Sequence, residues 1–144
     1  MERKWIITGL VLLITGIILG AFGAHALKDL LMDPDRFIAP DQITYVLPAE
    51  KLNSFETGVR YQLIHALGFM IVPFIANYFG VNSKWSFRLL LTGVIFFSFS
   101  IYMLTLKDIL GMPGLKFFGP VTPLGGLLMI LGWTILLISI IRKR

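Results

Sequence analysis

Cysteine is absent from the 144 residues, and histidine occurs only twice. The lack of thiols excludes disulfides, thiolate metal sites, iron–sulfur clusters and cysteine nucleophiles. Charge is also scarce, because charged residues make up 15% of the chain and hydrophobic residues 56%. An average soluble domain is about one-quarter charged. These proportions predict a small integral membrane protein.

Four stretches of the chain carry no Asp, Glu, Lys or Arg, at positions 5–26, 61–83, 89–106 and 117–141. A helix needs about 20 residues to cross a hydrocarbon core of ~30 Å, and its backbone must satisfy its own hydrogen bonds there. We therefore expect an all-α, integral membrane four-helix bundle with one span per stretch. Residues 1–144 form one membrane domain, because the longest connection, at 27–60, is too short to fold as a soluble domain of its own.

Basic residues near the helix ends predict how the chain is oriented. Seven of them are concentrated in three short segments: Arg3, Lys4, Lys84, Arg88, Arg142, Lys143 and Arg144. The other six are more dispersed, four of them along the 27–60 connection: Lys28, Arg36, Lys51, Arg60, Lys107 and Lys116. This distribution predicts that both termini are cytoplasmic and that 27–60 is an external loop.

A cleavable signal peptide is the alternative interpretation of the first stretch. Arg3 and Lys4 precede an apolar run that ends in Ala24-His25-Ala26, which resembles an A-x-A cleavage site. The apolar core of a signal peptide is usually about 7–15 residues long. Here the run is longer and contains several glycines, so we expect the first span to be retained.

Small residues recur in the first and fourth stretches, where they predict close helix packing. They are Gly9, Gly16, Gly20, Gly23, Ala24, Gly125 and Gly126. Small side chains on one stripe let another helix approach closely, which favours association within lipid. Packing inside the bundle is the favoured interpretation, and a homo-oligomer or another membrane-protein partner is the alternative.

Polar residues gather where the first stretch ends and the second begins. The candidates for a ligand or proton site are His25, Glu56, Arg60, Tyr61, Gln62 and His65. Glu56 and Arg60 are four apart, so they can pair on one helical face, and Asn53 with Glu56 has capping-box spacing. In an antiparallel hairpin, His25 and His65 are expected at similar depth on the outer side.

Two interpretations of this cluster remain open. The polar side chains can form an interhelical hydrogen-bond network, or they can bind a small solute or proton, since histidine changes charge near neutral pH. A zinc site made of His25, Glu56 and His65 has enough ligands but lacks the spacing of a known motif, so we expect no metal and no other cofactor.

No catalytic or nucleic-acid-binding pattern is visible. The chain has no serine nucleophile elbow, phosphate-binding glycine loop or dinucleotide fingerprint. It also lacks a basic run interleaved with aromatic residues. We therefore expect a protein that is not an enzyme, has the lipid bilayer as its surroundings, and does not bind nucleic acid.

Several of these segments resemble one known family. They are GAFGAHALK at 20–28, FETGVRYQLIHALG at 55–68, FSFSIYML at 97–104, VTPLGG at 121–126 and GW at 132–133. Together they resemble the YgdD/YwdK-like family of small bacterial membrane proteins, a domain of unknown function. The resemblance implies a four-helix, multi-pass protein of the plasma (inner) membrane and no particular activity. The stretch between Lys28 and Phe55 is longer than is typical of the family, and it can lie at the interface or cover the polar cluster.

The polar cluster predicts a membrane protein that binds or conducts a small solute or proton from the outer side. The alternative is an accessory or assembly subunit that acts by helix–helix contacts in a membrane complex. The sequence identifies no ligand, no oligomeric state and no role for the first external loop.

Overall fold

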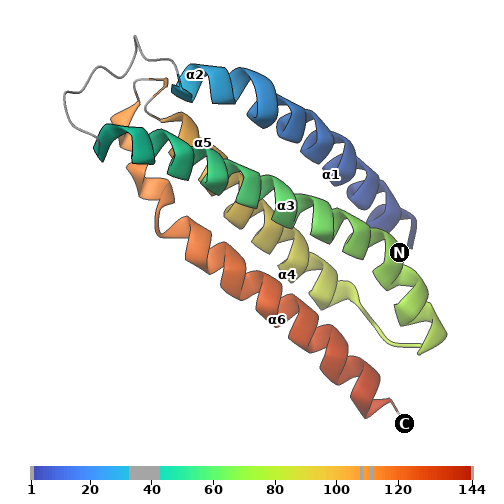
Figure 1. Ribbon diagram of the computed structural model, residues 1–144. Coiled ribbons are helices and arrows are strands. Elements are labelled where there is room, and N and C mark those ends of the chain that lie inside the picture. The colour runs from blue at the N-terminus through green and yellow to red at the C-terminus, as the bar shows by residue number, and fades with distance from the viewer. Residues whose placement is uncertain (1, 33–42, 108, 111, 144) are drawn as a thin grey trace.

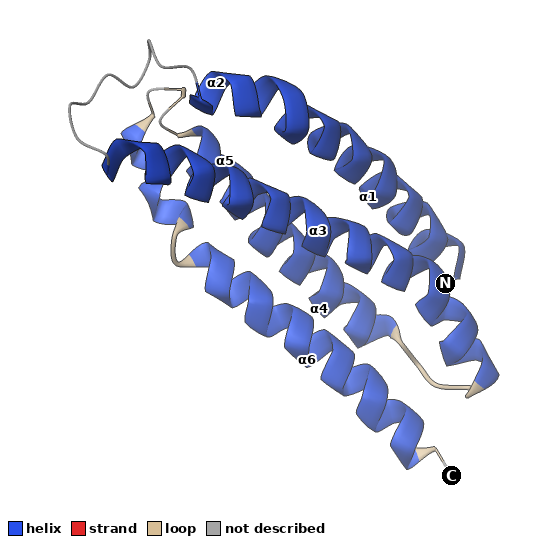
Figure 2. Ribbon diagram, viewed as in Figure 1, coloured by secondary structure: helices blue, strands red, loops and turns tan. Residues whose placement is uncertain are grey.

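The computed structural model describes residues 2–32, 43–107, 109–110 and 112–143, and regular structure in these ranges is helical throughout (Figure 2). Four helical rods in this part are long and apolar enough to cross a membrane: Arg3–Leu31, Ala49–Tyr78, Lys84–Leu106 and Gly114–Arg142. Figure 1 shows them side by side, with both chain termini at one end of the bundle. The expected all-α, four-helix membrane fold is confirmed, whereas the side of the membrane on which the termini lie stays a prediction.

The four rods are built from nine helical segments. In chain order they are α1 (Glu2–Phe22), the π-helical turn η1 (Gly23–Leu27), α2 (Lys28–Met32), α3 (Ile43–Tyr78), α4 (Lys84–Val94), the π-helical turn η2 (Ile95–Phe99), α5 (Ser100–Leu106), the 3-10 helix η3 (Pro113–Phe118) and α6 (Val121–Arg142). The residues that flank each π turn have right-handed helical dihedral angles. The first and third rods are therefore continuous through their π turns.

The helices extend well beyond the apolar stretches. The described part of the expected loop at 27–60 is mostly helical, because α2 continues the first rod and α3 begins at Ile43. The hydropathy pattern identifies only the part of a helix that lies in the hydrocarbon core. The helix itself can continue into water, because its backbone hydrogen bonds stay intact there. Asn53 therefore lies inside α3, where its carbonyl accepts a bond of 2.9 Å from Thr57 Oγ1, and the expected capping box is wrong. The stretch at 33–42, including Arg36, lies outside the described residues.

The rods pack as two hairpins that share contacts through α3. α1 packs along α3, and α4 packs along α6, while η2 and α5 join the second hairpin to α3. Figure 1 shows the same order, with α3 between α1 and α4 and with α6 on the far side of α4. α3 is therefore the helix that holds the two hairpins together.

Most of the small residues of the first stretch face α3. A Cβ atom added to Gly16 would lie 2.7 Å from Leu63 Cδ2, and one added to Gly23 would lie 3.0 Å from the Phe55 ring. Gly9 and Gly20 also face α3, at Ala66 and Val59 respectively. This stripe therefore brings α1 close to α3. Ala24, in contrast, is exposed.

A second glycine seam joins α4 to α6. A Cβ atom on Gly125 would meet the backbone of Phe97 and would lie 2.8 Å from the Gly93 carbonyl oxygen. The neighbouring Gly126 is looser, because its nearest atom, in the Phe97 ring, is 3.9 Å away. Gly93, which the sequence analysis did not single out, is thus part of the closest helix contact in the second hairpin, and Gly126 is not.

Two apolar clusters fill the bundle, one toward each end. The cluster near the termini contains Trp5, Phe69, Val72, Leu90, Val94, Met129 and Leu136. The cluster at the opposite end contains Leu27, Leu31, Phe55, Val59 and Tyr102. Many large apolar side chains instead face outward, among them Ile14, Ile18, Phe74, Ile130 and Leu137. Such a surface suits lipid, in which exposed apolar side chains carry no cost.

The two adjacent glycines of α6 give a matched test of the seam. We expect Gly125→Ala to lower the free energy of unfolding by about 1–3 kcal/mol, since the added methyl group overpacks against backbone that cannot move aside. Gly126→Ala makes the same change in helix propensity, and the added methyl group has open space around it. The stability of this variant should therefore be unchanged or higher. Denaturant unfolding in detergent measures both, and equal losses would contradict the packing described here.

Candidate functional site

The six candidate site residues do not converge on one site. Glu56 and Arg60 share an exposed face of α3, whereas Gln62 and His65 lie on another face and are buried, with 5% and 7% of their surface exposed. Tyr61 is 41% exposed. His25 is exposed on η1. The expected outer polar cluster is therefore divided between the surface and the interior.

The two histidines differ in depth, contrary to the sequence-based expectation. Gly23 lies beside Phe55 and Gly16 beside Leu63, so His25 is level with the part of α3 that precedes Phe55. His65 lies about twelve residues further along α3, which corresponds to about 17 Å at 1.5 Å per residue. The expected depth was wrong because apolar residues do not define the register between two helices. A zinc site that uses both histidines is ruled out by this separation.

Glu56 and Arg60 line a shallow cavity of about 300 Å³ between α1 and α3. Both side chains are exposed, and no ion pair between them is found within the part of the chain that the structure describes. Exposed pairs of this kind contribute at most about 1 kcal/mol. Nor do three metal-ligating side chains gather anywhere in these residues.

Gln62 is the centre of a hydrogen-bond network among three helices. Its Nε2 donates to the Leu12 carbonyl oxygen at 2.9 Å and to Thr15 Oγ1 at 2.8 Å, both on α1. Its Oε1 accepts a bond of 2.9 Å from the Tyr102 hydroxyl on α5. Both halves of the amide are therefore used, and α1, α3 and α5 are held in one register.

His65 joins α3 to α6 and has both ring nitrogens occupied. Nδ1 lies 2.8 Å from the Tyr61 carbonyl oxygen, which can only accept, so Nδ1 carries the proton. Nε2 lies 3.2 Å from Trp133 Nε1, which can only donate, so Nε2 is the acceptor. These partners require a neutral imidazole in the Nδ1–H form. A second proton on Nε2 would oppose the indole N–H.

Other buried hydroxyl groups also make interhelical bonds. Ser98 Oγ donates to the Gly58 carbonyl oxygen at 2.8 Å, and Ser86 Oγ donates to the Gly132 carbonyl oxygen at 2.9 Å. The hydrogen-bond network, one of the two interpretations drawn from the sequence, thus describes Gln62, His65, Ser86 and Ser98. The side chains of Gln62 and His65 are engaged with other groups of the bundle.

Two larger polar cavities lie at opposite ends of the bundle, and sequence reasoning singled out neither. The loop-end cavity, of about 530 Å³, is lined by Glu50, Lys51, Ser54, Thr57, Ile101, Leu104, Thr105, Lys107 and Thr122. The termini-end cavity, of about 520 Å³, is lined by Arg3, Trp5, Pro73, Ala76, Asn77, Gly80, Val81 and Ser83. Both cavities lie where charged residues flank apolar stretches, and this is the sequence feature that could have indicated them. Their residues are distant in sequence and meet only through the helix pairing.

The Gln62 network can be tested by a double-mutant cycle. Gln62→Leu preserves bulk but removes three bonds, so we expect the free energy of unfolding to fall by roughly 1–2 kcal/mol, since such bonds average about 0.6 kcal/mol in membranes. Tyr102→Phe removes one of the same bonds. The double variant should therefore lose less than the two single losses combined. Strictly additive losses in detergent unfolding would show that the two residues are not coupled.

The tautomer of His65 is a second expected outcome. Nitrogen NMR of the ring in the intact protein at neutral pH should show a protonated Nδ1 and an unprotonated Nε2, because each nitrogen has a partner of one kind only. Trp133→Phe removes the donor to Nε2 and should shift that nitrogen's resonance most. A ring protonated at Nε2 would contradict the assignment.

Comparison with known proteins places the chain in a family. A family model described as "Protein of unknown function (DUF423)" matches residues 19–126. A UPF0382 membrane protein of Staphylococcus haemolyticus is 35% identical over 137 residues, which cover 95% of this chain and 94% of the relative. The UPF0382 membrane protein YwdK of Bacillus subtilis is 31% identical over 142 residues, 97% of this chain and 98% of the relative.

The family is not confined to bacteria, since a UPF0382 membrane protein of Schizosaccharomyces pombe is 34% identical over 128 residues, 87% of this chain and 93% of the relative. No solved structure matches the chain. The names of these relatives state that they are membrane proteins and state no activity. The resemblance drawn from the sequence motifs is confirmed: the chain belongs to the DUF423 family of small membrane proteins.

Proposed function

We propose that this protein is a non-enzymatic, multi-pass protein of the plasma membrane that binds a small zwitterionic solute in the loop-end cavity. The observation that carries the proposal is the composition of that cavity. Its lining residues include the acidic Glu50 and the basic Lys51 and Lys107. Residues of positive and negative charge around one cavity suit a solute that itself carries both a positive and a negative charge.

The shape of the loop-end cavity supports this role. Its volume of about 530 Å³ lies within the range of about 300–1,000 Å³ that is usual for small-molecule pockets. Its walls come from α3, α5 and the first turn of α6. Hydroxyl groups, including those of Thr57 and Thr105, add hydrogen-bonding capacity between the charged ends.

Binding is favoured over conduction because the middle of the bundle is closed by its own hydrogen bonds. The amide of Gln62 and the ring of His65 are fully bonded to other helices. A solute in the loop-end cavity would have to break these bonds to pass further. We therefore retain solute binding from the sequence-based hypothesis, although with different residues. We do not retain conduction.

The distribution of basic residues supports a cytoplasmic position for both termini and, with it, an outer position for the loop-end cavity. We propose that the chain works without an obligatory partner helix. The proposal is supported by the glycines of α1 that suggested such a partner, because they pack against α3 instead. The exposed apolar surface is accounted for by lipid.

The proposal is tested by thermal unfolding of the detergent-purified protein with a panel of zwitterionic amino acids and betaines. A solute that binds the folded state should raise the Tm with its concentration, by the equivalent of about 2.7 kcal/mol at a hundredfold excess over Kd. Glu50→Gln should abolish the rise, because the variant lacks the carboxylate that pairs with the solute's cation.

Glu56→Gln is the matched control, since it makes the same change on the same helix but lines a different cavity. It should retain the full response. The proposal is wrong if no member of the panel raises the Tm, or if the two variants lose the response equally.

A further inference from the structure

Two buried polar groups at the termini end of the bundle have no hydrogen-bond partner. Trp5 and Ser83 are each 1% exposed, and in the described part of the chain Trp5 Nε1 and Ser83 Oγ are the buried side-chain nitrogen and oxygen atoms left without a bond. Leaving a buried donor unbonded costs free energy and calls for an explanation. Both residues line the same termini-end cavity.

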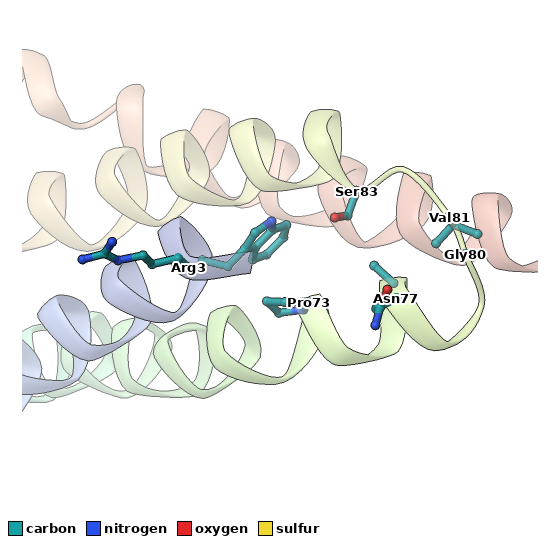
Figure 3. Close-up of a pocket in the computed structure, with 8 residues that line it drawn as sticks. Arg3, Pro73, Asn77, Gly80, Val81 and Ser83 are labelled. Carbon is teal, nitrogen blue, oxygen red and sulfur yellow. The ribbon is translucent and has the colours of Figure 1, made fainter. Parts of the chain in front are cut away.

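Ser83 is placed as a helix cap but does not act as one. It occupies the N-cap position of α4, where a serine normally accepts a bond from the first turn, yet its side chain makes no such bond. The Lys84 N–H, which a cap side chain at Ser83 would not reach, is bonded to Asn82 Oδ1 at 3.0 Å. The Ser83 hydroxyl is not used at the start of the helix, and Figure 3 shows it turned inward, toward the space between α4 and the helices that carry Arg3 and Pro73.

The termini-end cavity offers hydrogen-bond donors and positive charge. Trp5 has only a donor and Ser83 has a hydroxyl. Arg3 also lines the cavity, and its guanidinium group extends away from Ser83 and Asn77 in Figure 3. No acidic residue is among its lining residues. The positive end of the α4 dipole also lies here, because α4 begins directly after Ser83.

The wider surroundings carry an excess of positive charge. Besides Arg3, the described basic residues at this end are Lys4, Lys84, Arg88, Arg142 and Lys143, and the one described acidic residue at this end is Glu2. Lys143 Nζ donates to the Gly80 carbonyl oxygen, so one of the backbone acceptors that line the cavity is already occupied. An anion with several acceptor oxygens is the chemical complement of such a site.

We propose that the termini-end cavity binds a phosphate group, with the Trp5 indole N–H and the Ser83 hydroxyl donating to its oxygens and Arg3 supplying the opposite charge. The phosphate belongs either to a lipid headgroup or to a soluble phosphorylated compound. The volume of about 520 Å³ leaves room for the rest of such a molecule. This site is separate from the solute site proposed above, since the two cavities lie at opposite ends of the bundle.

The indole N–H of Trp5 gives a direct readout. The full-length, nitrogen-labelled protein in maltoside micelles, which carry no phosphate, is titrated with inorganic phosphate while the tryptophan side-chain resonances are followed by NMR. Trp5→Phe assigns the resonance of Trp5. We expect that resonance to move downfield and to saturate, while the resonance of Trp133, which is already bonded to His65, stays in place.

Variants separate the site from the general basicity of this end. Ser83→Ala and Arg3→Gln should each weaken the titration by about tenfold, the loss expected for one hydrogen bond to a charged group. Lys4→Gln is the matched control for Arg3→Gln. It removes the same charge from the adjacent position, which does not line the cavity, and should leave the affinity within about twofold.

Phospholipid nanodiscs without added phosphate distinguish the two sources of the ligand. A Trp5 resonance already displaced in nanodiscs that contain phosphatidylglycerol assigns the site to a headgroup. Displacement by free phosphate alone assigns it to a soluble compound. The proposal is overturned if neither condition moves the resonance, which would leave water as the partner of both donors, or if Lys4→Gln weakens binding as much as Arg3→Gln.

Discussion

The side-chain amide of Gln62 joins three helices at the middle of the bundle, and the arrangement of the other parts depends on it. The hydrocarbon core provides no water to satisfy a polar group, so an amide at this depth must find its partners on neighbouring helices. Leu12 and Thr15 on α1 and Tyr102 on α5 provide them. Their positions constrain how α1 and α5 are aligned with α3, and the glycines on α1 bring the backbones close enough for these bonds to form.

This bonded layer divides the molecule into two ends of different chemical character. The loop end has a cavity that contains charges of both signs, and the termini end has a cavity that offers donors and positive charge. The bonds of Gln62 and His65 lie between them. The two sites proposed above would therefore be separated from each other by this bonded layer.

The number and type of helices followed from the sequence because the thickness of hydrocarbon imposes a length on every apolar span. The start of α3 did not, since residues 43–60 contain charges that water tolerates and lipid does not. The sequence identified the polar candidate residues, but it did not show which of them lie together. Glu56 and Arg60 face outward while Gln62 and His65 face inward, and the partners Tyr102 and Trp133 are far away in sequence.

The two cavities show a different limit of sequence reasoning. In the sequence, Trp5 is an apolar residue at the start of a span, and Ser83 is an ordinary N-cap residue for the helix that follows it. Only the pairing of α1 with α3 and the position of α4 show that both side chains are buried without partners beside one cavity. An unmet hydrogen bond is a property of three-dimensional packing and has no signature in a single sequence.

The π turn η2 has a consequence for the inner face of its rod. Buried side chains there recur at every fourth position: Ser86, Leu90, Val94, Ser98 and Tyr102. In a uniform α-helix that spacing drifts by about 40° per step, so the last member would point well away from the first. The wider loop of backbone at η2 takes up part of the accumulated rotation, and the Tyr102 hydroxyl beyond it reaches Gln62. Shortening η2 by one residue would swing that hydroxyl by about 100°, so the position of Tyr102 depends on the chain length at this turn.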